Sequence, residues 1–357
     1  MDEYHLDPAI LAALPTGRVV SVTRHGKTNW STGYKLVVDV DGETQEYFLK
    51  VLDCPRSDEM ARGEFESQKA LKEIIPVNIV APVAWNRFQS DPRMAFYLTH
   101  FRHLLDELPT TSQLLPIVKK IHESSSSPTG KFGFPVTTFW GPLPMDNSWT
   151  DSWEEYFTRK FRSALEYGQI PCGKDDELSD LGDKIIQKVI PRLLRPLQSG
   201  GRNIKPILCH GDLYDANVQI DASTGHPILF DPCCFYGHHE MDFQSMRAAR
   251  NTLGPDFVNA YKEQVGASEP QEDFDDRNAL YSMRADLETV GMWPQWRTLL
   301  DHVKNEMRRL LAKHPNGIDG FLDEIGDLSS NTNPTQHWGL TASAEVSRSE
   351  HESIKVD

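Results

Sequence analysis

The chain has 357 residues and a formal net charge of −15, because 52 Asp and Glu outnumber 37 Lys and Arg. Hydrophobic residues make up 39% of the chain, enough for a packed core, and the length predicts two domains or one large bilobal one. The acidic balance argues against a nucleic-acid or membrane-surface binder, since either partner requires a basic face. No run approaches about 18 apolar residues, the start lacks a signal-peptide pattern and the cysteines form no CxxC pair, so we expect a cytoplasmic protein without a membrane span.

The first hundred residues are expected to form a small sheet with one prominent helix. Apolar residues at positions 6, 10, 11 and 14 predict a short helix over 1–14, and the stretch 57–74, rich in Glu, Ala, Lys and Leu, predicts a longer one. Runs of β-branched and aromatic residues predict five strands, at 18–22, 34–40, 45–51, 83–85 and 94–99. Asp41-Gly42 predicts a hairpin turn between the second and third strands.

The rest of the chain is predicted to be mostly helical. Apolar periodicity indicates helices at 112–123, 151–167, 175–197, 239–251, 255–265, 273–290 and 296–313. One compact stretch between them, 206–231, is typical of strands. From residue 328 the chain is rich in Ser, Thr, Asn and Glu without apolar periodicity, which predicts a disordered tail over 328–357.

The segment with the clearest chemistry runs I-L-C-H-G-D-L-Y-D-A-N-V over 207–218 and P-I-L-F-D-P over 227–232. Asp212 and Asn217 have the D-x-x-x-x-N spacing of a kinase catalytic loop, where Asp orients the accepting hydroxyl and Asn binds a metal. Asp231 ends an apolar strand, where a kinase places its second metal-binding carboxylate. A turn stabilised by Asx residues would explain His-Gly-Asp alone, but the three residues together favour phosphoryl transfer with Mg²⁺.

Residues upstream fit the same site. Lys50 on the third predicted strand matches the phosphate-pairing lysine of the kinase pattern, although without the Asp212 segment an exposed strand lysine would be the default interpretation. Glu64 and Glu66 on the next helix are both candidates for its ion pair. The turn over 25–30, with His25 and Gly26, has the position of a phosphate-covering loop, but an ordinary hairpin turn explains its single Gly equally well.

Two further blocks resemble the fructosamine-3-kinase family, also called ketosamine or protein-ribulosamine 3-kinases. The run D-P-C-C-F-Y-G-H-H-E-M-D-F over 231–243 is similar to that family's DPAxFYGHxExEL. K-F-G-F over 131–134, Gly141 and W-T-D-S-W-E-E-Y-F over 149–157 are similar to its KFGF…G…W…DW..FF stretch. The matches span about residues 48–245. Aminoglycoside phosphotransferases and choline kinases share the His-Gly-Asp, Asn and Asp pattern but not these blocks.

The resemblance implies an α+β, bilobal, protein-kinase-like fold, with a small β-rich N-lobe over 1–102 and a larger, mainly helical C-lobe over 103–327. It also implies phosphorylation by ATP and Mg²⁺ of the sugar 3-hydroxyl of ketosamines, the glycation adducts of amines and protein lysines. The 3-phosphate then promotes spontaneous loss of the sugar, which regenerates the amine. Two alternatives stay open: a related kinase with an aminoglycoside, choline-like or other sugar acceptor, and a catalytically silent kinase-fold binding protein.

Carried over by position, the resemblance gives each candidate residue a role. Asp212 would be the catalytic base, with Asn217 and Asp231 as Mg²⁺ ligands. Lys50 would hold the α- and β-phosphates, and Glu64 is preferred over Glu66 as its partner because Gly63-Glu64 matches the family's GE. The backbone of a hinge would bind adenine, over Leu98, Thr99, His100 and Phe101.

Several residues near the catalytic loop are candidates for holding the acceptor: Tyr214, Phe235, Tyr236, His238 and Glu288. For Phe235 and Tyr236 the alternative is core packing, and for His238 it is a structural role. Glu240 is a candidate for meeting a cationic amine, whereas Asp242 is expected to cap a helix and brace the loop. Met292, Trp293 and Trp296 are expected to pack in the core or in a cleft wall, with acceptor stacking as the alternative.

The sequence also departs from the family pattern at the acceptor side. Tyr214 replaces the family's usual Trp, and Glu288-Thr289 stands where the family has Asn-His. An extra carboxylate at Glu288 would suit a more cationic acceptor, so the identity of the acceptor is the open question. Cys233 and Cys234 follow Asp231 closely; small buried residues are the simpler interpretation, and a redox role is the alternative.

Overall fold

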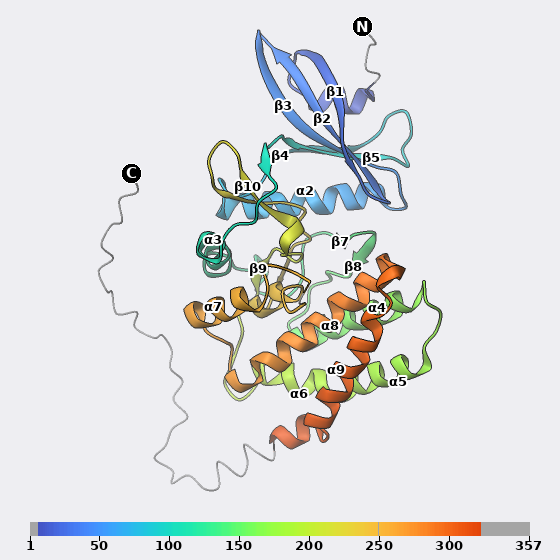
Figure 1. Cartoon of the computed structure of the whole chain (residues 1–357), viewed down its shortest axis with the longest axis vertical. Helices are drawn as coiled ribbons and strands as arrows, with labels where there is room; N and C mark the ends of the chain where they lie inside the picture. The colour runs from blue at the N-terminus through green and yellow to red at the C-terminus, as the bar shows by residue number, and fades with distance from the viewer. Residues whose placement is uncertain (1–5, 249, 323–357) are drawn as a thin grey trace, which may run out of the picture.

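A computed structural model describes residues 6–248 and 250–322, and the predicted tail over 328–357 lies outside this range. Figure 1 shows two lobes stacked along the long axis, with the N-terminal sheet at one end and a helical lobe at the other. The α+β fold predicted from the sequence is therefore confirmed. None of the helices in the described part of the chain has the length and apolar composition of a membrane span.

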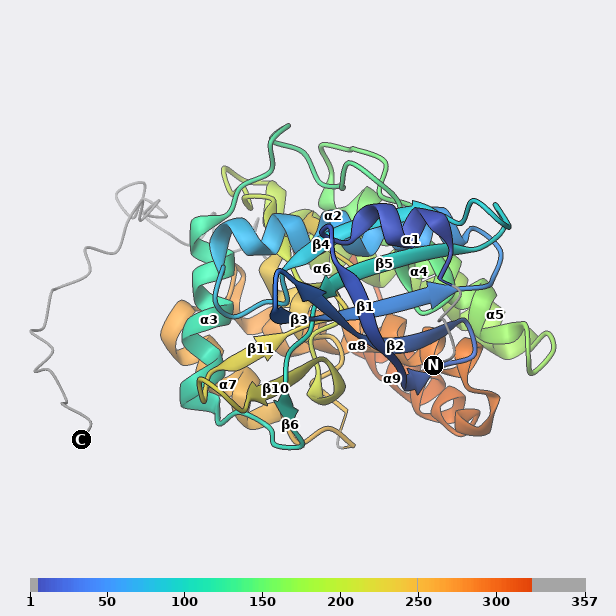
Figure 2. The ribbon, with the colours of Figure 1, turned by 90° about the horizontal axis from the view of Figure 1, so that it is seen from above.

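The N-lobe is a five-stranded antiparallel sheet with the strand order β1-β2-β3-β5-β4. The strands are β1 (Arg18–Lys27), β2 (Ser31–Val40), β3 (Glu43–Leu52), β4 (Pro82–Arg87) and β5 (Ala95–His100). All five predicted strands are present, and the view from above shows them lying over the C-lobe helices (Figure 2). The first strand runs five residues further than predicted, so the turn before β2 is reduced to residues 28–30.

Alternation along β3 sends its side chains to two different faces of the sheet. Tyr47 and Leu49 pack in the cluster that includes α1 (Pro8–Ala13), whereas Leu52 packs with Met60 of α2 (Ser57–Ile74) on the opposite face. Lys50 has the same parity as Leu52, so the strand directs it toward α2. The pleat of one strand thus brings a lysine to the helix that carries the predicted glutamates.

The C-lobe is built from seven α-helices over the described residues: α3 (Thr111–Ser124), α4 (Trp153–Gln169), α5 (Asp176–Lys184), α6 (Ile190–Leu194), α7 (Pro255–Val265), α8 (Phe274–Met292) and α9 (Leu299–Lys313). Helices α4 and α8 pack on each other around the fully buried Trp153 and Tyr281. Helix α8 is buried on nearly all sides, which is why its charged residues, including Arg277 and Arg284, have partners inside the lobe.

Short strands position the loops that face the N-lobe. β6 (Leu104–Leu105) and β11 (Pro227–Leu229) flank β10 (Val218–Asp221), and β9 (Ile207–Cys209) pairs with β12 (Phe235–Gly237). A hairpin of β7 (Thr138–Trp140) and β8 (Leu143–Met145) lies beside α2. The chain passes from β5 in the large sheet directly to β6 in the C-lobe, so the two lobes meet where these loops gather.

Two helix predictions were wrong in detail. Within the predicted helix over 239–251, the described residues form only a short 3₁₀ turn over His239–Phe243 followed by further turns, and Glu240 and Asp242 are both buried against tertiary partners. Glu240 is bound by Arg277, and Asp242 is bound by the backbone of His210 and Gly211, so long-range hydrogen bonds rather than helical periodicity set this segment. Residues 175–197 form α5, a π-helical turn over Ile185–Val189 and α6; Pro191, which lacks a backbone N–H, follows the irregular turn.

Gly63 lets α2 approach the hairpin at residues 137–138. A Cβ at this position would lie 2.5 Å from the Thr137 carbonyl oxygen, which is backbone and cannot move aside easily. We expect Gly63→Ala to lower the free energy of unfolding by about 1–3 kcal/mol in urea denaturation, as overpacking does. The exposed neighbour Arg62→Ala is the control, with a change within about 0.5 kcal/mol. A more stable Gly63→Ala protein would contradict this packing.

Candidate active site

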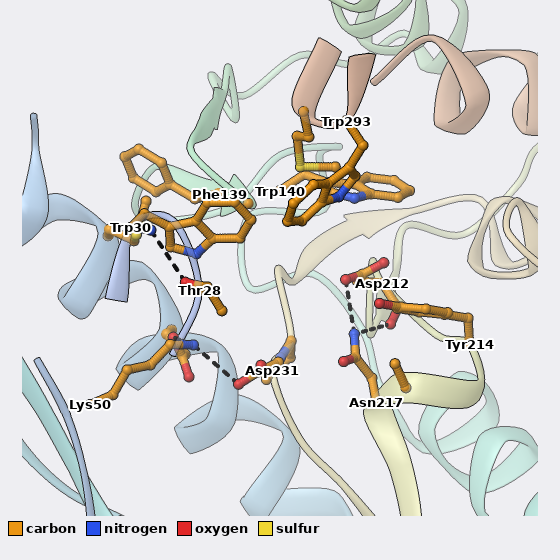
Figure 3. A pocket seen from close by; sticks show the side chains of 16 residues that line it. Thr28, Trp30, Lys50, Phe139, Trp140, Asp212, Tyr214, Asn217, Asp231 and Trp293 are labelled. Atoms are coloured by element: carbon orange, nitrogen blue, oxygen red, sulfur yellow. Dashed lines mark hydrogen bonds and ion pairs between the residues drawn. The ribbon is translucent and has the colours of Figure 1, made fainter. Parts of the chain in front are cut away.

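A cavity of about 300 Å³ lies between the lobes and collects the predicted catalytic residues. In Figure 3, Lys50 and Asp231 lie on one side of it, and Asp212, Tyr214 and Asn217 lie on the other. The lining comes from the β1–β2 turn, β3, α2, the β7–β8 hairpin, the catalytic loop and the end of α8: Thr28, Trp30, Lys50, Met60, Glu64, Phe139, Trp140, Gly141, Asp212, Tyr214, Ala216, Asn217, Asp231, Pro232, Met292 and Trp293.

The catalytic loop is held from below by one buried carboxylate. Asp242 accepts hydrogen bonds from the backbone N–H groups of His210 (3.0 Å) and Gly211 (2.8 Å), and it also contacts His122 Nε2 (3.1 Å). Burial raises the pKa of Asp242, but the hydrogen bond from His122 and its other contacts hold it below its ordinary value. Gly211 has φ +86°, and a Cβ there would lie 2.2 Å from the Cys233 carbonyl oxygen. The loop therefore requires both the glycine and its carboxylate anchor, as predicted for bracing by Asp242.

Asp212 and Asn217 form a tight pair inside the loop. The Asn217 amide donates from Nδ2 to the Asp212 backbone carbonyl and to Asp212 Oδ2, both at 2.8 Å. The backbone carbonyl of Asn217 accepts a hydrogen bond from the Phe230 N–H at 3.1 Å. This bond connects the loop to the residue before Asp231. Asp231 has φ +50°, a conformation that is costly for a residue with a side chain and that turns the chain sharply after β11. The five-residue spacing and the two adjoining segments thus bring an amide and two carboxylates to one cavity.

Lys50 joins the two lobes through its ammonium group. Nζ lies 2.8 Å from Glu64 Oε2 and 3.2 Å from Asp231 Oδ1, and its side chain is 12% exposed. Burial alone would lower the pKa of Lys50, but Asp231 and Glu64 raise it above its ordinary value, so the lysine stays charged. The structure therefore pairs Lys50 with Glu64, and not with Glu66, the other candidate.

Burial also changes the proton affinity of Asp212. It raises the pKa of this carboxyl to about 7, the hydrogen bond from Asn217 opposes the rise, and the nearby charge of Asp231 adds to it. A carboxylate of this kind is a better proton acceptor than one in water, because its charged form is poorly solvated. The environment of Asp212 thus suits a group that takes a proton from a hydroxyl.

A neighbouring cavity of about 240 Å³ contains most of the predicted adenine-side residues. His25, Thr99, His100 and Phe101 line it, together with Glu64 and Asp231 at the border with the first cavity. Four of its lining side chains have buried polar atoms without a hydrogen-bond partner among the described residues: Gln68 Oε1, Tyr97 OH, Thr99 Oγ1 and Arg102 Nε. Unsatisfied polar atoms in an otherwise largely apolar wall suit a polar heterocyclic ligand.

The predicted hinge differs in one respect from the expectation that its backbone binds adenine. The His100 N–H donates to the Ala81 carbonyl (3.1 Å) and the Phe101 N–H donates to the Glu46 carbonyl (3.0 Å), so both amides are already used within the lobe. Gly26, at φ +110°, adjoins His25 but lies outside the linings of the two cavities between the described lobes. The side chains of this cavity, rather than those two amides, offer the free polar atoms.

Of the five acceptor candidates, only Tyr214 lines the cavity. Phe235 is buried between Trp153 and Tyr156, because its pairing in β12 with Cys209 of β9 points it into the core. Tyr236 stacks on Trp149 at 6.2 Å, away from the site. The placement of Phe235 and Tyr236 in the acceptor site was therefore wrong, and packing explains both.

The placements of His238, Glu240 and Glu288 near the acceptor were also wrong. His238 is fully buried and contacts the hydroxyls of Tyr281 and Ser268 at 2.9 and 2.8 Å. Glu240 receives a bidentate pair of hydrogen bonds from Arg277 at 2.7 and 2.9 Å, so it is not open to a cationic amine. Glu288 lies behind the cavity wall, where it is 1% exposed and paired with Arg284 at 2.7 Å. The partner of Glu240 lies 37 residues away in the chain, whereas that of Glu288 lies four residues earlier on the same helix.

The sequence predicted Tyr214 beside the acceptor and Met292 and Trp293 in the core or a cleft wall, but it did not predict Trp30, Phe139 or Trp140 in the wall of the cavity. Trp30 follows the β1–β2 turn, whose shape is set by hydrogen bonds from the Trp30 and Ser31 N–H groups to Thr28 Oγ1. Its ring lies 5.9 Å from that of Trp293 at the end of α8, so the turn reaches across to the C-lobe. Trp140, on β7, has the Arg284 guanidinium 4.6 Å from its ring centre. The available signal was the aromatic pair Phe139-Trp140 directly before Gly141, of which only Gly141 belongs to the resemblance to the family pattern.

Cys233 and Cys234 are both buried, which agrees with the simpler interpretation of these residues. Burial is the main reason why the pKa of each thiol lies above its ordinary value. The nearby charge of Asp212 raises the pKa of Cys233 further, and Cys233 raises that of Cys234. Protonated thiols are weak nucleophiles and weak redox groups. The structure therefore gives no support to a redox role at this position.

The residues present fit a nucleotide and a divalent cation. Asp231 offers a carboxylate that is 50% exposed, and Asn217 offers an amide oxygen, because its Nδ2 is directed at Asp212. Carboxylate and amide oxygens are ligands that Mg²⁺ accepts, and a positively charged lysine beside them suits phosphate. The polar atoms of the neighbouring cavity that lack a partner among the described residues include both donors and an acceptor, the amide oxygen of Gln68, which a base can use.

The two lobes and this arrangement of residues define a protein-kinase-like fold, which solved structures of aminoglycoside phosphotransferases share. A protein of Thermobifida fusca assigned as a fructosamine-3-kinase superposes with a TM-score of 0.63 and 22% identity, over 84% of this chain and 98% of that one. The aminoglycoside phosphotransferase APH(4)-Ia, in a ternary complex with AMP-PNP and hygromycin B, superposes with a TM-score of 0.59 and 13% identity, over 85% and 98%. Both likenesses show the fold.

The family is shown by the sequence. The fructosamine kinase family model matches residues 21–313, so the chain belongs to the fructosamine kinase family. A chloroplastic protein-ribulosamine 3-kinase of Oryza sativa subsp. japonica is 31% identical over 163 residues, which are 45% of this chain and 44% of the relative. The ketosamine-3-kinase of Mus musculus is 35% identical over 136 residues, 38% and 41%. The matched segment thus spans less than half the length of these relatives.

The two glutamates of α2 provide a matched test of the lysine pair. We expect Glu64→Gln to reduce kcat/KM for ATP by about 10–100-fold, because it removes a charge-assisted hydrogen bond worth about 1.5–3 kcal/mol from Lys50. Glu66→Gln, two positions along the same helix, is expected to have little effect. Steady-state kinetics at varied ATP measures both. Equal losses in the two variants would contradict the pairing.

Proposed function

We propose that this protein is an ATP-dependent kinase that phosphorylates the sugar 3-hydroxyl of ketosamines, carried on amines or on protein lysines. The observation that carries the proposal is the convergence of Lys50, Asp212, Asn217 and Asp231 on one cavity. Membership of the fructosamine kinase family supports the ketosamine as acceptor. We also retain 1–102 and 103–327 as the two lobes and the cytoplasm as the location.

In this proposal each residue has one task. Lys50, fixed by Glu64, binds phosphate oxygens, and Asn217 and Asp231 would hold Mg²⁺. ATP with Mg²⁺ supplies the transferable phosphoryl group and a cation that offsets its developing charge. Asp212 orients the acceptor hydroxyl and receives its proton, and Asn217 keeps the Asp212 carboxylate in place through its amide. His25, Thr99, His100 and Phe101 form the wall on the nucleotide side.

The acceptor would lie on the opposite side of Asp212 from the nucleotide. Tyr214 and Trp140 flank the carboxylate there, and Trp30 and Trp293 bring the phosphate-side turn and the end of α8 together above it (Figure 3). Aromatic faces bind the apolar faces of sugars and attract cations.

Asp212→Asn tests the proton acceptor directly. The new amide oxygen can still accept from Asn217, so we expect the fold and ATP binding to persist while kcat falls by about 10²–10⁴-fold. ATP binding by calorimetry and turnover by ADP release measure the two effects. Asp106→Asn, in an exposed loop, is the control. Turnover near that of the unaltered protein would remove Asp212 from the proposed chemistry.

The acceptor is tested by ³¹P NMR after incubation with ATP, Mg²⁺ and either a ribulosamine or a fructosamine of a simple amine. We expect a new sugar 3-phosphate resonance with at least one of them, and the relative rates rank the two sugars. ATP turnover without transfer to either acceptor would indicate a different acceptor. Absence of both ATP binding and turnover would instead indicate a silent binding protein.

A further inference from the structure

A third cavity, of about 380 Å³, opens on the side of Asp212 that faces away from the proposed nucleotide site. It shares five lining residues with the transfer cavity: Trp140, Asp212, Tyr214, Met292 and Trp293. The two cavities therefore meet at the catalytic carboxylate. An acceptor with its hydroxyl at Asp212 has room to extend into this third cavity, which we call the carrier cavity.

The walls of the carrier cavity combine aromatic rings with one charge of each sign. Beyond the shared residues they consist of Ser245, Arg250, Asn251, Thr289 and Trp296. Arg250 is the one cation among these lining residues, and Asp212 is the one anion. Trp296 is 45% exposed, so its ring stands at the solvent side of the cavity.

Arg250 is held in place by a residue behind the wall. Its Nη2 donates to Asp286 Oδ1 at 2.9 Å, and Asp286, on the buried helix α8, is only 4% exposed. The Arg250 side chain is 29% exposed, and within residues 6–248 and 250–322 its remaining N–H groups have no hydrogen-bond partner. One donor thus fixes the guanidinium, and the others stay available to a ligand.

A guanidinium fixed in this way is suited to an anion, and to a carboxylate in particular. Its planar arrangement of N–H groups matches two carboxylate oxygens, and little rotational freedom is lost when a ligand binds because Asp286 already restrains the side chain. Trp293 and Trp296 present aromatic faces in the same cavity, which attract a cationic amine. The cavity as a whole is complementary to an ammonium and a carboxylate held close together.

We propose that the carrier cavity holds the amine half of the acceptor and that Arg250 binds a carboxylate next to the amine nitrogen. The preferred acceptors are then ketosamines of free α-amino acids, whose nitrogen and carboxylate are joined through a single carbon atom. This inference rests on the proposed ketosamine kinase function, since it requires the sugar 3-hydroxyl at Asp212. It makes Arg250 a residue that determines specificity and takes no part in the proton transfer.

The test compares two acceptors that differ in one charge, the ribulosamines of glycine and of glycinamide. We expect kcat/KM for the glycine adduct to exceed that for the glycinamide adduct by about 10–100-fold, the range of one charge-assisted, bidentate contact. Arg250→Gln is expected to bring this ratio close to one, and Arg250→Lys to an intermediate value. Equal kcat/KM values in the unaltered protein, or a ratio that Arg250→Gln leaves unchanged, would overturn the proposal.

Arg247→Gln is the matched control. Arg247 lies three residues earlier, has a side chain that is 28% exposed and is paired with Asp275 at 2.7 Å, but it does not line the carrier cavity. We expect it to keep the glycine-to-glycinamide ratio. Thermal unfolding of both variants checks that their folds are intact, and loss of the ratio in Arg247→Gln as well would overturn the specific role of Arg250.

Two further measurements separate the sources of failure. Calorimetry of the binding of the two adducts without ATP reports on Arg250 even if no phosphate is transferred. Preferred binding of the glycine adduct without any turnover would refute the proposed kinase function and support the carboxylate site. The same guanidinium could instead meet a phosphate on the sugar. A ribulosamine 5-phosphate of glycinamide tests this, and sensitivity to Arg250→Gln with that adduct alone would overturn the assignment.

Discussion

The arrangement of the site depends on one ammonium group placed between two carboxylates. Lys50 comes from the sheet, Glu64 from the helix packed against it and Asp231 from the other lobe, 181 residues further along the chain. Removing the lysine from water is unfavourable unless opposite charges surround it, and both carboxylates would repel each other without it. The same three-way contact thus joins the two lobes and defines the place where phosphate would bind.

A second buried carboxylate organises the lower wall. Asp242 holds the backbone of His210 and Gly211, and His122 connects it to Tyr261, whose hydroxyl lies 2.8 Å from His122 Nδ1. Burial lowers the pKa of His239, which extends the same network, to about 3, so that this histidine stays neutral and acts only as a hydrogen-bonding group. This network of buried hydrogen bonds holds the backbone of the loop in one position below Asp212.

On the acceptor side, the charges of α8 lie behind the cavity wall and not on its surface. Glu288 and Arg284 neutralise each other behind the wall, and the Arg284 guanidinium packs against Trp140, so the surface offered to the acceptor is aromatic rather than acidic. The two departures from the family pattern, at residues 214 and 288, therefore have different effects on the cavity. Tyr214 faces the cavity and alters its shape, whereas Glu288 acts through its pairing inside the lobe.

The sequence by itself determined the two-lobed α+β fold, the strands and most helices, and the set of residues at Lys50, Asp212, Asn217 and Asp231. These follow from local periodicity and from short, fixed spacings, which constrain the chain directly. The resemblance already preferred Glu64 over Glu66 as the partner of Lys50, but only the tertiary structure decided that Phe235 and His238 lie in the interior and that Tyr236 stacks on Trp149. It also placed Trp30, Trp140 and Arg250 around Asp212. Which side chains share a cavity depends on contacts between distant segments, and a linear pattern does not contain that information.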